Sequence, residues 1–188
     1  MKIKFVDAHK IRNTINPEFG VACTRQISPY IPEGEMWFDK AYKKEKKEII
    51  AMRAFEQKLM NKGLTFEESK KEAYKKFLIK IKKIPDFVKK IEKKGKITLK
   101  YVDGAIVRKY IDPNFILGSH EYVKKCVPKG EVWIDLVQDK REIKYTIIHE
   151  LYERNLMIKG MDYNSAHDFA LAAEKYQRRK DGAIYLDD

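Results

Sequence analysis

The segments PEGEMWFD (residues 32–39) and PKGEVWID (residues 128–135) repeat each other and decide the predicted fold. In both, a Pro-x-Gly turn leads into a run of residues that favour β-strands. The agreement extends outward from them, at a spacing of 96 residues before Asp39 and 97 residues further along the chain. The matched residues include Val6 and Val102, Arg12 and Arg108, Phe19 and Phe115, Glu56 and Glu153, and Gly63 and Gly160. Self-similarity at a long fixed period predicts that the chain is a tandem duplication.

Each half is predicted to contain the same elements in the same order: a strand, the Pro-x-Gly turn, a second strand, a long amphipathic helix and a final helix. In the first half these are Ile3–Val6, Glu35–Asp39, Lys44–Asn61 ended by Gly63, and a helix starting at Thr65 with Glu68 as its capping box. In the second half they are Ile97–Val102, Glu131–Leu136, Lys140–Ile158 ended by Gly160, and a helix starting at Asp162. We therefore expect an α+β pseudo-dimer in which each half packs a small sheet against two main helices.

The charge is distributed unevenly between the halves. Residues 1–97 hold 25 basic and 13 acidic residues, a net charge of +12, whereas residues 98–188 hold 15 of each. We predict three parts: a basic, degenerate repeat over 1–84, a Lys-rich linker over 85–96 and a metal-binding repeat over 97–188. The abundance of Lys, Glu and Ile is also typical of a heat-adapted host.

Composition sets limits on the class of protein. Hydrophobic residues make up 44% and charged residues 36% of the 188 residues, which excludes a disordered chain. No apolar run approaches the roughly 18 residues of a membrane-spanning helix, and the N-terminal segment has no apolar core typical of a leader peptide. The two cysteines, Cys23 and Cys126, cannot form a disulfide framework. We expect a cytoplasmic protein with no membrane partner.

The duplication offers an internal control, because residues present in only one half are candidates for chemistry. His149 and Glu150 in the second half correspond to Met52 and Arg53 in the first. On the final helix, His167 corresponds to Lys70 and Glu174 to Phe77. The concerted loss predicts one active site that has decayed in the first copy.

The spacing of these residues fits a metal site. His149 and Glu153 are i and i+4, so they lie on one helix face, one turn apart. Ile143, Ile147 and Leu151 fall on the opposite face and are expected to anchor the helix to the core. A final helix running antiparallel would bring His167 back to complete three protein ligands with an open fourth position. Glu150 lies about 100° further round the helix than His149.

The segment from His149 to Arg178 reads His-Glu-x-x-Glu-Arg, then Leu-Met-x-x-Gly, then Tyr-x-x-Ala-His, then Glu174 and Arg178. It resembles the compact zincin-like domains of viral, plasmid and other mobile-element proteins, a variant of the His-Glu-x-x-His metallopeptidases. The resemblance implies Zn²⁺ held by His149, Glu153 and His167, Glu150 as general base, and a peptide or protein substrate. Glu153 replaces a second histidine, and an anionic ligand makes zinc a weaker Lewis acid.

The roles of the remaining polar residues around the motif stay open at this stage. Glu174 is either a partner that orients a ligand, a fourth ligand, or a surface ion pair with Arg178, and Tyr152 flanks the polar line. His120 corresponds to Thr24 and is not counted among the site residues, and His9 is interpreted as an ordinary surface histidine.

The competing prediction is a nucleic-acid-binding protein of a virus or mobile element that uses the basic first repeat, with the metal site structural or vestigial. Lysines recur at helical intervals in the basic half, and such a stripe can neutralise phosphates without reading sequence. The candidates are Lys43, Lys47, Lys70, Lys71, Lys75 and Lys76. Interleaved glutamates instead favour solvated, ion-paired helices. The sequence does not name a substrate or an oligomeric state.

Overall fold

The two Pro-x-Gly turns form as predicted and start the central strand of each sheet. The backbone N–H of Glu35 donates to the carbonyl oxygen of Pro32 at 3.1 Å, and the matching bond recurs in the second segment. Gly34 and Gly130 have φ of 75° and 79°, which glycine adopts without steric cost. In the computed structural model, which describes residues 1–185, the chain has an α+β fold with two mixed β-sheets.

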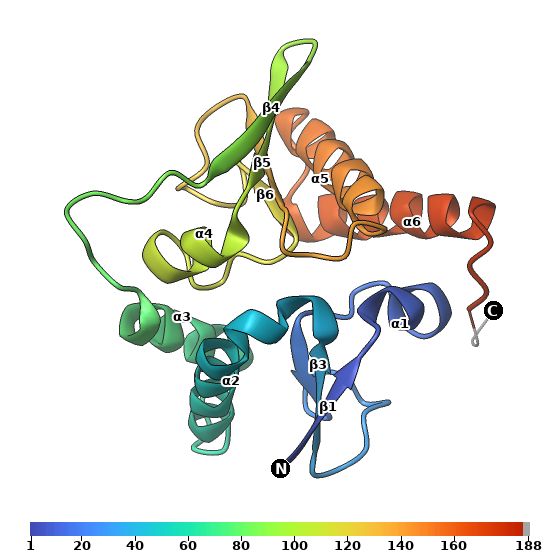
Figure 1. The fold of residues 1–188 in the computed structure, drawn as a ribbon. Coiled ribbons are helices and arrows are strands. Elements are labelled where there is room, and N and C mark those ends of the chain that lie inside the picture. Colours follow the sequence, from blue (N-terminus) through green and yellow to red (C-terminus); the bar gives the residue numbers. More distant parts are fainter. Residues whose placement is uncertain (186–188) are drawn as a thin grey trace.

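The chain forms two lobes, the first comprising residues 1–77 and the second residues 88–185 (Figure 1). The first lobe contains β1 (Lys2–Val6), α1 (Ala8–Thr14), β2 (Ala22–Thr24), β3 (Glu35–Asp39), the 3-10 helix η1 (Lys40–Glu45), α2 (Lys46–Met60) and α3 (Phe66–Phe77). The second lobe contains β4 (Val88–Lys94), β5 (Ile97–Val102), α4 (Gly104–Tyr110), β6 (Gly118–His120), β7 (Glu131–Asp135), α5 (Ile143–Ile158) and α6 (Tyr163–Lys180).

The sheets share a pattern of strand pairing. The first has the order β1-β3-β2, with β3 parallel to β1 and antiparallel to β2. The second has the order β4-β5-β7-β6, in which β7 is likewise parallel to β5 and antiparallel to β6. The extra strand, β4, pairs antiparallel with β5 at the edge.

The signals predicted for the helix ends are present. Thr65 and Glu68 form a capping box at the start of α3, and the side chain of Asp162 accepts from the backbone N–H of Ser165 at the start of α6. Gly63 and Gly160 follow the long helices, both with φ of 95°. The long helices themselves begin later than predicted: α2 starts at Lys46 after the separate helix η1, and α5 starts at Ile143.

Part of the segment predicted as a linker is a strand. Residues 88–94 form β4, whose lysines left no apolar alternation to reveal it; edge strands tolerate such charges. The short strands β2 and β6 and the short helices α1 and α4 were also not predicted. The helices did carry a signal, because Asp7 and Asp103 cap them with their side chains.

The core of the second lobe forms between α5 and the sheet. Leu99, Tyr101, Val132 and Ile134 make a buried cluster on the sheet, and Ile143, Ile147 and Leu151 of α5 pack against it. This confirms the prediction that these three side chains anchor the helix. The face of α5 that carries His149 and Glu153 meets α6 and the edge strand β6.

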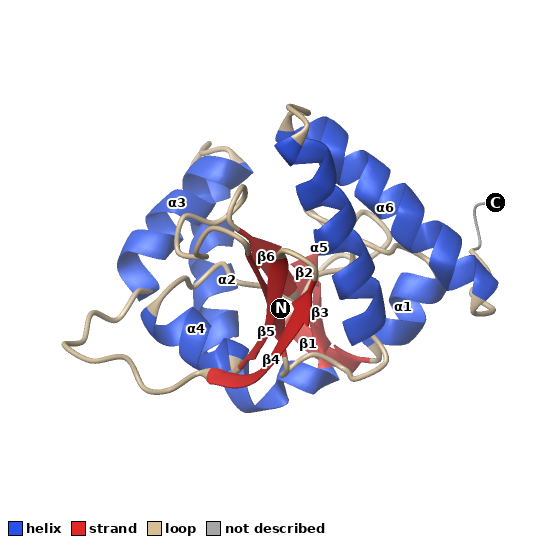
Figure 2. Ribbon diagram, turned by 90° about the horizontal axis from the view of Figure 1, so that it is seen from above, coloured by secondary structure: helices blue, strands red, loops and turns tan. Residues whose placement is uncertain are grey.

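Two buried arginines join the lobes in a reciprocal way. Arg12 of the first lobe pairs with Glu142 of the second at 3.2 Å, and Arg108 of the second lobe bonds Glu45 of the first through two nitrogens at 2.7 Å each. Glu45 and Glu142 occupy corresponding positions, 97 residues apart. Figure 2 shows the result: α1 lies beside α5 and α6, and α4 lies beside α2 and α3. Among residues 1–185, no helix is long and apolar enough to span a membrane.

Candidate metal centre

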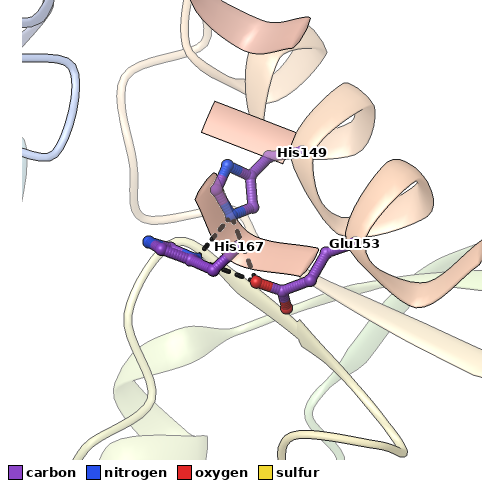
Figure 3. Close-up of side chains that lie close together, drawn as sticks. All are labelled: His149, Glu153 and His167. Atoms are coloured by element: carbon purple, nitrogen blue, oxygen red, sulfur yellow. Dashed lines mark hydrogen bonds and ion pairs between the residues drawn. The ribbon is translucent and has the colours of Figure 1, made fainter. Parts of the chain in front are cut away.

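Three predicted ligands meet where α5 and α6 face each other (Figure 3). Nε2 of His149 lies 3.1 Å from Nδ1 of His167, and that nitrogen lies 2.8 Å from Oε2 of Glu153. The third separation, from Nε2 of His149 to Oε2 of Glu153, is 3.6 Å. One atom from each side chain therefore points at a common centre.

The helix hairpin explains why these side chains meet. His149 and Glu153 are one turn apart on α5, and the Gly160 turn reverses the chain so that α6 packs along α5. On α6, the fully buried Ala166 and Ala170 permit a close approach of the two helices. His167, next to Ala166, is thereby brought over the polar face of α5.

A series of polar contacts on the Nδ1 side of the ring holds His149 in place. Its Nδ1 lies 3.0 Å from Oε2 of Glu174, and Nε of Arg178 donates to Oε1 of the same carboxylate at 2.8 Å. Arg178 also donates to Glu142 at 2.6 Å, and Glu142 pairs with Arg12 of the first lobe. A carboxylate on the far nitrogen orients a ligating histidine and fixes its tautomer. The pair of Glu174 and Arg178 forms, but it is buried rather than on the surface.

His120 of β6 completes the surroundings of Glu153. Its Nε2 lies 2.9 Å from Oε1 of Glu153, the oxygen that faces away from His149 and His167. The His120 side chain is fully buried. This contact was not predicted, because His120 was not counted among the site residues. The criterion that singled out His149 would have found it, because His120 is also present in only one half, with Thr24 in the other.

The charges in the cluster are strongly coupled. Burial alone would lower the pKa of His149, but hydrogen bonds to Glu153 and Glu174 raise this pKa to about 10. Hydrogen bonds to Glu153 and Glu18 raise the pKa of His167 to about 9. Contacts with the three histidines hold the pKa of Glu153 well below its usual range, against the effect of burial. Burial raises the pKa of Glu150 to about 7.

Two imidazole nitrogens and one carboxylate oxygen form a group that could hold a metal ion, and their spacing can be compared with that of zinc ligands. Nitrogen and carboxylate ligands of a tetrahedral zinc lie about 2.0–2.2 Å from the ion, which places any two of them roughly 3.4 Å apart. The separations of 3.1, 2.8 and 3.6 Å lie around this value. Two histidines and one glutamate with an open position are a known catalytic zinc shell.

The cluster opens into a cleft between the lobes. The cleft has a volume of about 900 Å³ and is lined by both lobes, with His149, Glu150 and His167 on one side and Glu18 and Lys70 on the other. Glu18 lies 3.4 Å from Nε2 of His167. No sequence signal indicated that the first lobe would contribute residues here, because this depends on how the lobes pack.

The corresponding place in the first lobe is built differently. Met52 is buried in the place of His149, and Arg53 pairs with Glu56, the counterpart of Glu153, through Nη1. Lys70, the counterpart of His167, pairs with Glu67 at 3.2 Å. A fixed cationic side chain thus neutralises the buried glutamate of this lobe.

Other predicted residues lie outside the cluster. Tyr152 is 43% exposed and does not line the cleft. His9 is not a surface histidine, since it is half-buried and contacts Glu142 and Asn13. Most lysines predicted for nucleic acid are exposed on η1, α2 and α3, while Lys70 is half-buried in the cleft; the exposed ones are Lys43, Lys47, Lys71, Lys75 and Lys76. Four of the six have partners: ion pairs for Lys70 and Lys75, aromatic rings for Lys43 and Lys76.

Comparison with protein-family models, with curated proteins and with solved structures finds no match to this chain. The functional assignment therefore rests on the geometry of the cluster.

Proposed function

We propose that the protein is a metal-dependent hydrolase whose active site is the cleft between the lobes. The observation that carries this proposal is the convergence of His149, Glu153 and His167, each with one ligand atom within 3.6 Å of the other two. The position of these side chains at the edge of a large cleft supports catalysis over a purely structural ion, because a substrate can reach them.

The resident ion we propose is zinc, which supplies, when bound, a Lewis acid that activates water and polarises a carbonyl group. The chain's own contribution comes from Glu150, which lines the same cleft. Its carboxylate accepts the proton of the attacking water and passes it to the leaving amine. Glu174 keeps the ring of His149 oriented, and Arg178 keeps Glu174 in place.

The proposed substrate is a peptide or protein segment bound between the lobes. The cleft volume of about 900 Å³ accommodates several residues of an extended chain. Lys70 and Glu18 of the first lobe face this space, so the lobe without the ligand cluster takes part in substrate binding.

We also propose that the two lobes arose by tandem duplication and that the first copy lost its site. The shared strand pairing and the reciprocal contacts of Arg12 and Arg108 support this history. Both arginines in addition donate to the carbonyl oxygen of a matched phenylalanine, Phe19 at 2.9 Å and Phe115 at 3.1 Å. Duplication explains why matched residues form the same contacts in both lobes.

Nucleic-acid binding remains a second candidate function. The exposure of Lys47 and Lys71 on α2 and α3 favours it, since exposed lysines can reach a phosphate backbone. The ion pairs of Lys70 and Lys75 count against it, because their charge is already compensated.

The experiment that tests the hydrolase is a comparison of two glutamates on α5. Zinc-loaded protein is incubated with a mixture of unstructured peptides, and cleavage is followed by mass spectrometry beside the metal content. Glu150→Gln is expected to retain zinc and lose at least about 100-fold in rate, the effect of removing a general base. Glu153→Gln is expected to lose zinc. Tyr152→Phe, on the exposed side of the same helix, is the matched control. Absence of cleavage by the wild type, or unchanged cleavage by Glu150→Gln, would overturn the proposal.

A further inference from the structure

A second group of possible ligands lies directly behind the first. His120, Glu150 and Glu153 each offer one ligand atom, and these atoms lie within 4.8 Å of one another. Glu153 belongs to both groups, with Oε1 toward His120 at 2.9 Å and Oε2 toward His167 at 2.8 Å. A carboxylate placed in this way can bind two cations at once, one through each oxygen.

The first lobe has a positively charged side chain at the place that corresponds to this second group. At the position of Glu150 it has Arg53, whose guanidinium pairs with Glu56, the counterpart of Glu153. The side chains of Arg53 and Glu56 are 9% and 1% exposed. A cation thus sits beside this glutamate in the first lobe, held there by its own side chain.

In the second lobe, histidines rather than an arginine or a lysine contact this glutamate. Within residues 1–185, neither Glu150 nor Glu153 forms an ion pair with a lysine or arginine; Glu153 contacts only histidines. Glu150 and Glu153 are 9% and 3% exposed, so two carboxylates are buried side by side. Buried carboxylates are costly unless a positive charge or a proton compensates them, and the histidines beside Glu153 supply part of that compensation.

The backbone leaves room for the Glu150 side chain at this place. Gly118 of β6 lies against α5, and a Cβ added there would come within 3.1 Å of Oε1 of Glu150 and 2.8 Å of Cγ2 of Thr146. Glycine at this position therefore keeps the carboxylate next to His120. Imidazole and carboxylate together suit first-row divalent cations such as zinc.

We propose that His120, Glu150 and Glu153 form a second divalent-cation site that shares Glu153 with the first. It is the weaker of the two, because its ion shares an anionic ligand and repels the first ion. The consequence for catalysis rests on the proposed function: an ion bound to Glu150 occupies the carboxylate that accepts the proton, so excess metal lowers the rate of hydrolysis. The second site is thus an inhibitory site that lowers the rate of hydrolysis when free metal is abundant.

The test uses equilibrium dialysis of the purified full chain against Zn²⁺, with elemental analysis of the bound metal. The wild type is expected to hold one ion at low free zinc and two at high free zinc, with hydrolysis falling as the second ion binds. His120→Thr, which introduces the residue of the first lobe, and Glu150→Gln, which keeps the side-chain shape, are both expected to stop at one ion. Circular dichroism confirms that each variant is folded.

The outcomes separate this site from the proposed function. A wild type that never exceeds one ion, or a second ion retained in both variants, would overturn the second site and leave the hydrolase intact. Loss of the tight ion with retention of a weak one that depends on His120 would overturn the proposed active site and leave the second site standing. Hydrolysis that rises with the second ion would overturn its limiting role.

Discussion

The two lobes share the arginines of their interface and the glycines that end their long helices, but they carry different side chains on α2 and α5. Arg12 and Arg108 hold matched carboxylates across the lobe interface, and Gly63 and Gly160 end the long helices in the same conformation. On the facing helix surface, however, the first lobe has a closed ion pair between Arg53 and Glu56. The first lobe forms without a histidine cluster, which supports the proposal that the cluster of the second lobe binds an ion.

Removal of a buried interface carboxylate gives the largest expected effect on stability. Glu142→Ala would leave Arg12 and Arg178, with side chains 0% and 1% exposed, without their shared partner. Breaking a buried ion pair from one side costs about 3–5 kcal/mol in the free energy of unfolding. Denaturation by urea, followed by circular dichroism, measures this loss.

The matched change in the first lobe sharpens the comparison. Glu45→Ala is expected to cost less, about 1–3 kcal/mol, because Glu45 is more exposed than Glu142 and pairs with one arginine, Arg108, which keeps its bond to Asp135 at 2.6 Å. Equal losses in the Glu142 and Glu45 variants would show that the two contacts are energetically equivalent and would contradict this ranking.

Zinc is expected to stabilise the protein through the second lobe alone. At a free concentration 100 times the dissociation constant, a bound ion adds about 2.7 kcal/mol to the free energy of unfolding. Thermal denaturation with and without zinc should show this gain in the wild type and not in His167→Lys, which introduces the residue of the first lobe. A variant Met52→His, which introduces the residue of the second lobe, should add nothing, because Arg53 still pairs with Glu56 and Lys70 still replaces His167. An equal gain in His167→Lys would place the ion elsewhere.

Acid should weaken the interface in a way that depends on Glu142. Burial alone would raise the pKa of Glu142, but hydrogen bonding to Arg178 and the charge of Arg12 lower it below 4.5. A lowered pKa contributes stability that is complete above pH 4.5 and is lost as the pH falls through the folded-state value. The metal-free wild type should therefore lose more stability between pH 6 and pH 3 than Glu142→Gln does. Parallel curves for the two proteins would show that Glu142 does not carry the effect.

The smallest expected effect concerns the basic surface of the first lobe. If this surface binds DNA, affinity falls with salt, and each lysine–phosphate contact contributes about one unit to the slope of log affinity against log salt. Lys71→Ala should reduce that slope by about one. Lys124→Ala, a change in the second lobe at a lysine already paired with Asp112 at 2.7 Å, should leave it unchanged. Binding that is absent at low salt would reject the nucleic-acid function.

Much of the scaffold could be predicted because its signals are local or repeated. The Pro-x-Gly turns, the caps at Thr65 and Asp162 and the anchoring face of α5 depend on residues close in sequence. Strand β4 could not be predicted, because its lysines hide the alternation and its place is fixed by pairing with β5.

Only the part of the candidate site that lies on the hairpin of α5 and α6 could be predicted. His149, Glu153 and His167 lie on α5 and α6, whose spacing the sequence displays. His120 arrives from β6, 33 residues before Glu153, and its position depends on how the helix packs on the sheet. Glu18 and Lys70 reach the cleft from the first lobe, and this depends on the interface built by Arg12 and Arg108, which no local pattern displays.

The central claim is that the second lobe binds one metal ion tightly and the first lobe does not. The most direct test is elemental analysis of the purified protein after dialysis against metal-free buffer, with the wild type beside His149→Met, which introduces the first-lobe residue. From the proposed zinc site we expect one zinc ion per chain in the wild type and none in the variant. No metal in the wild type, two tightly bound ions per chain, or an unchanged content in His149→Met would contradict the account.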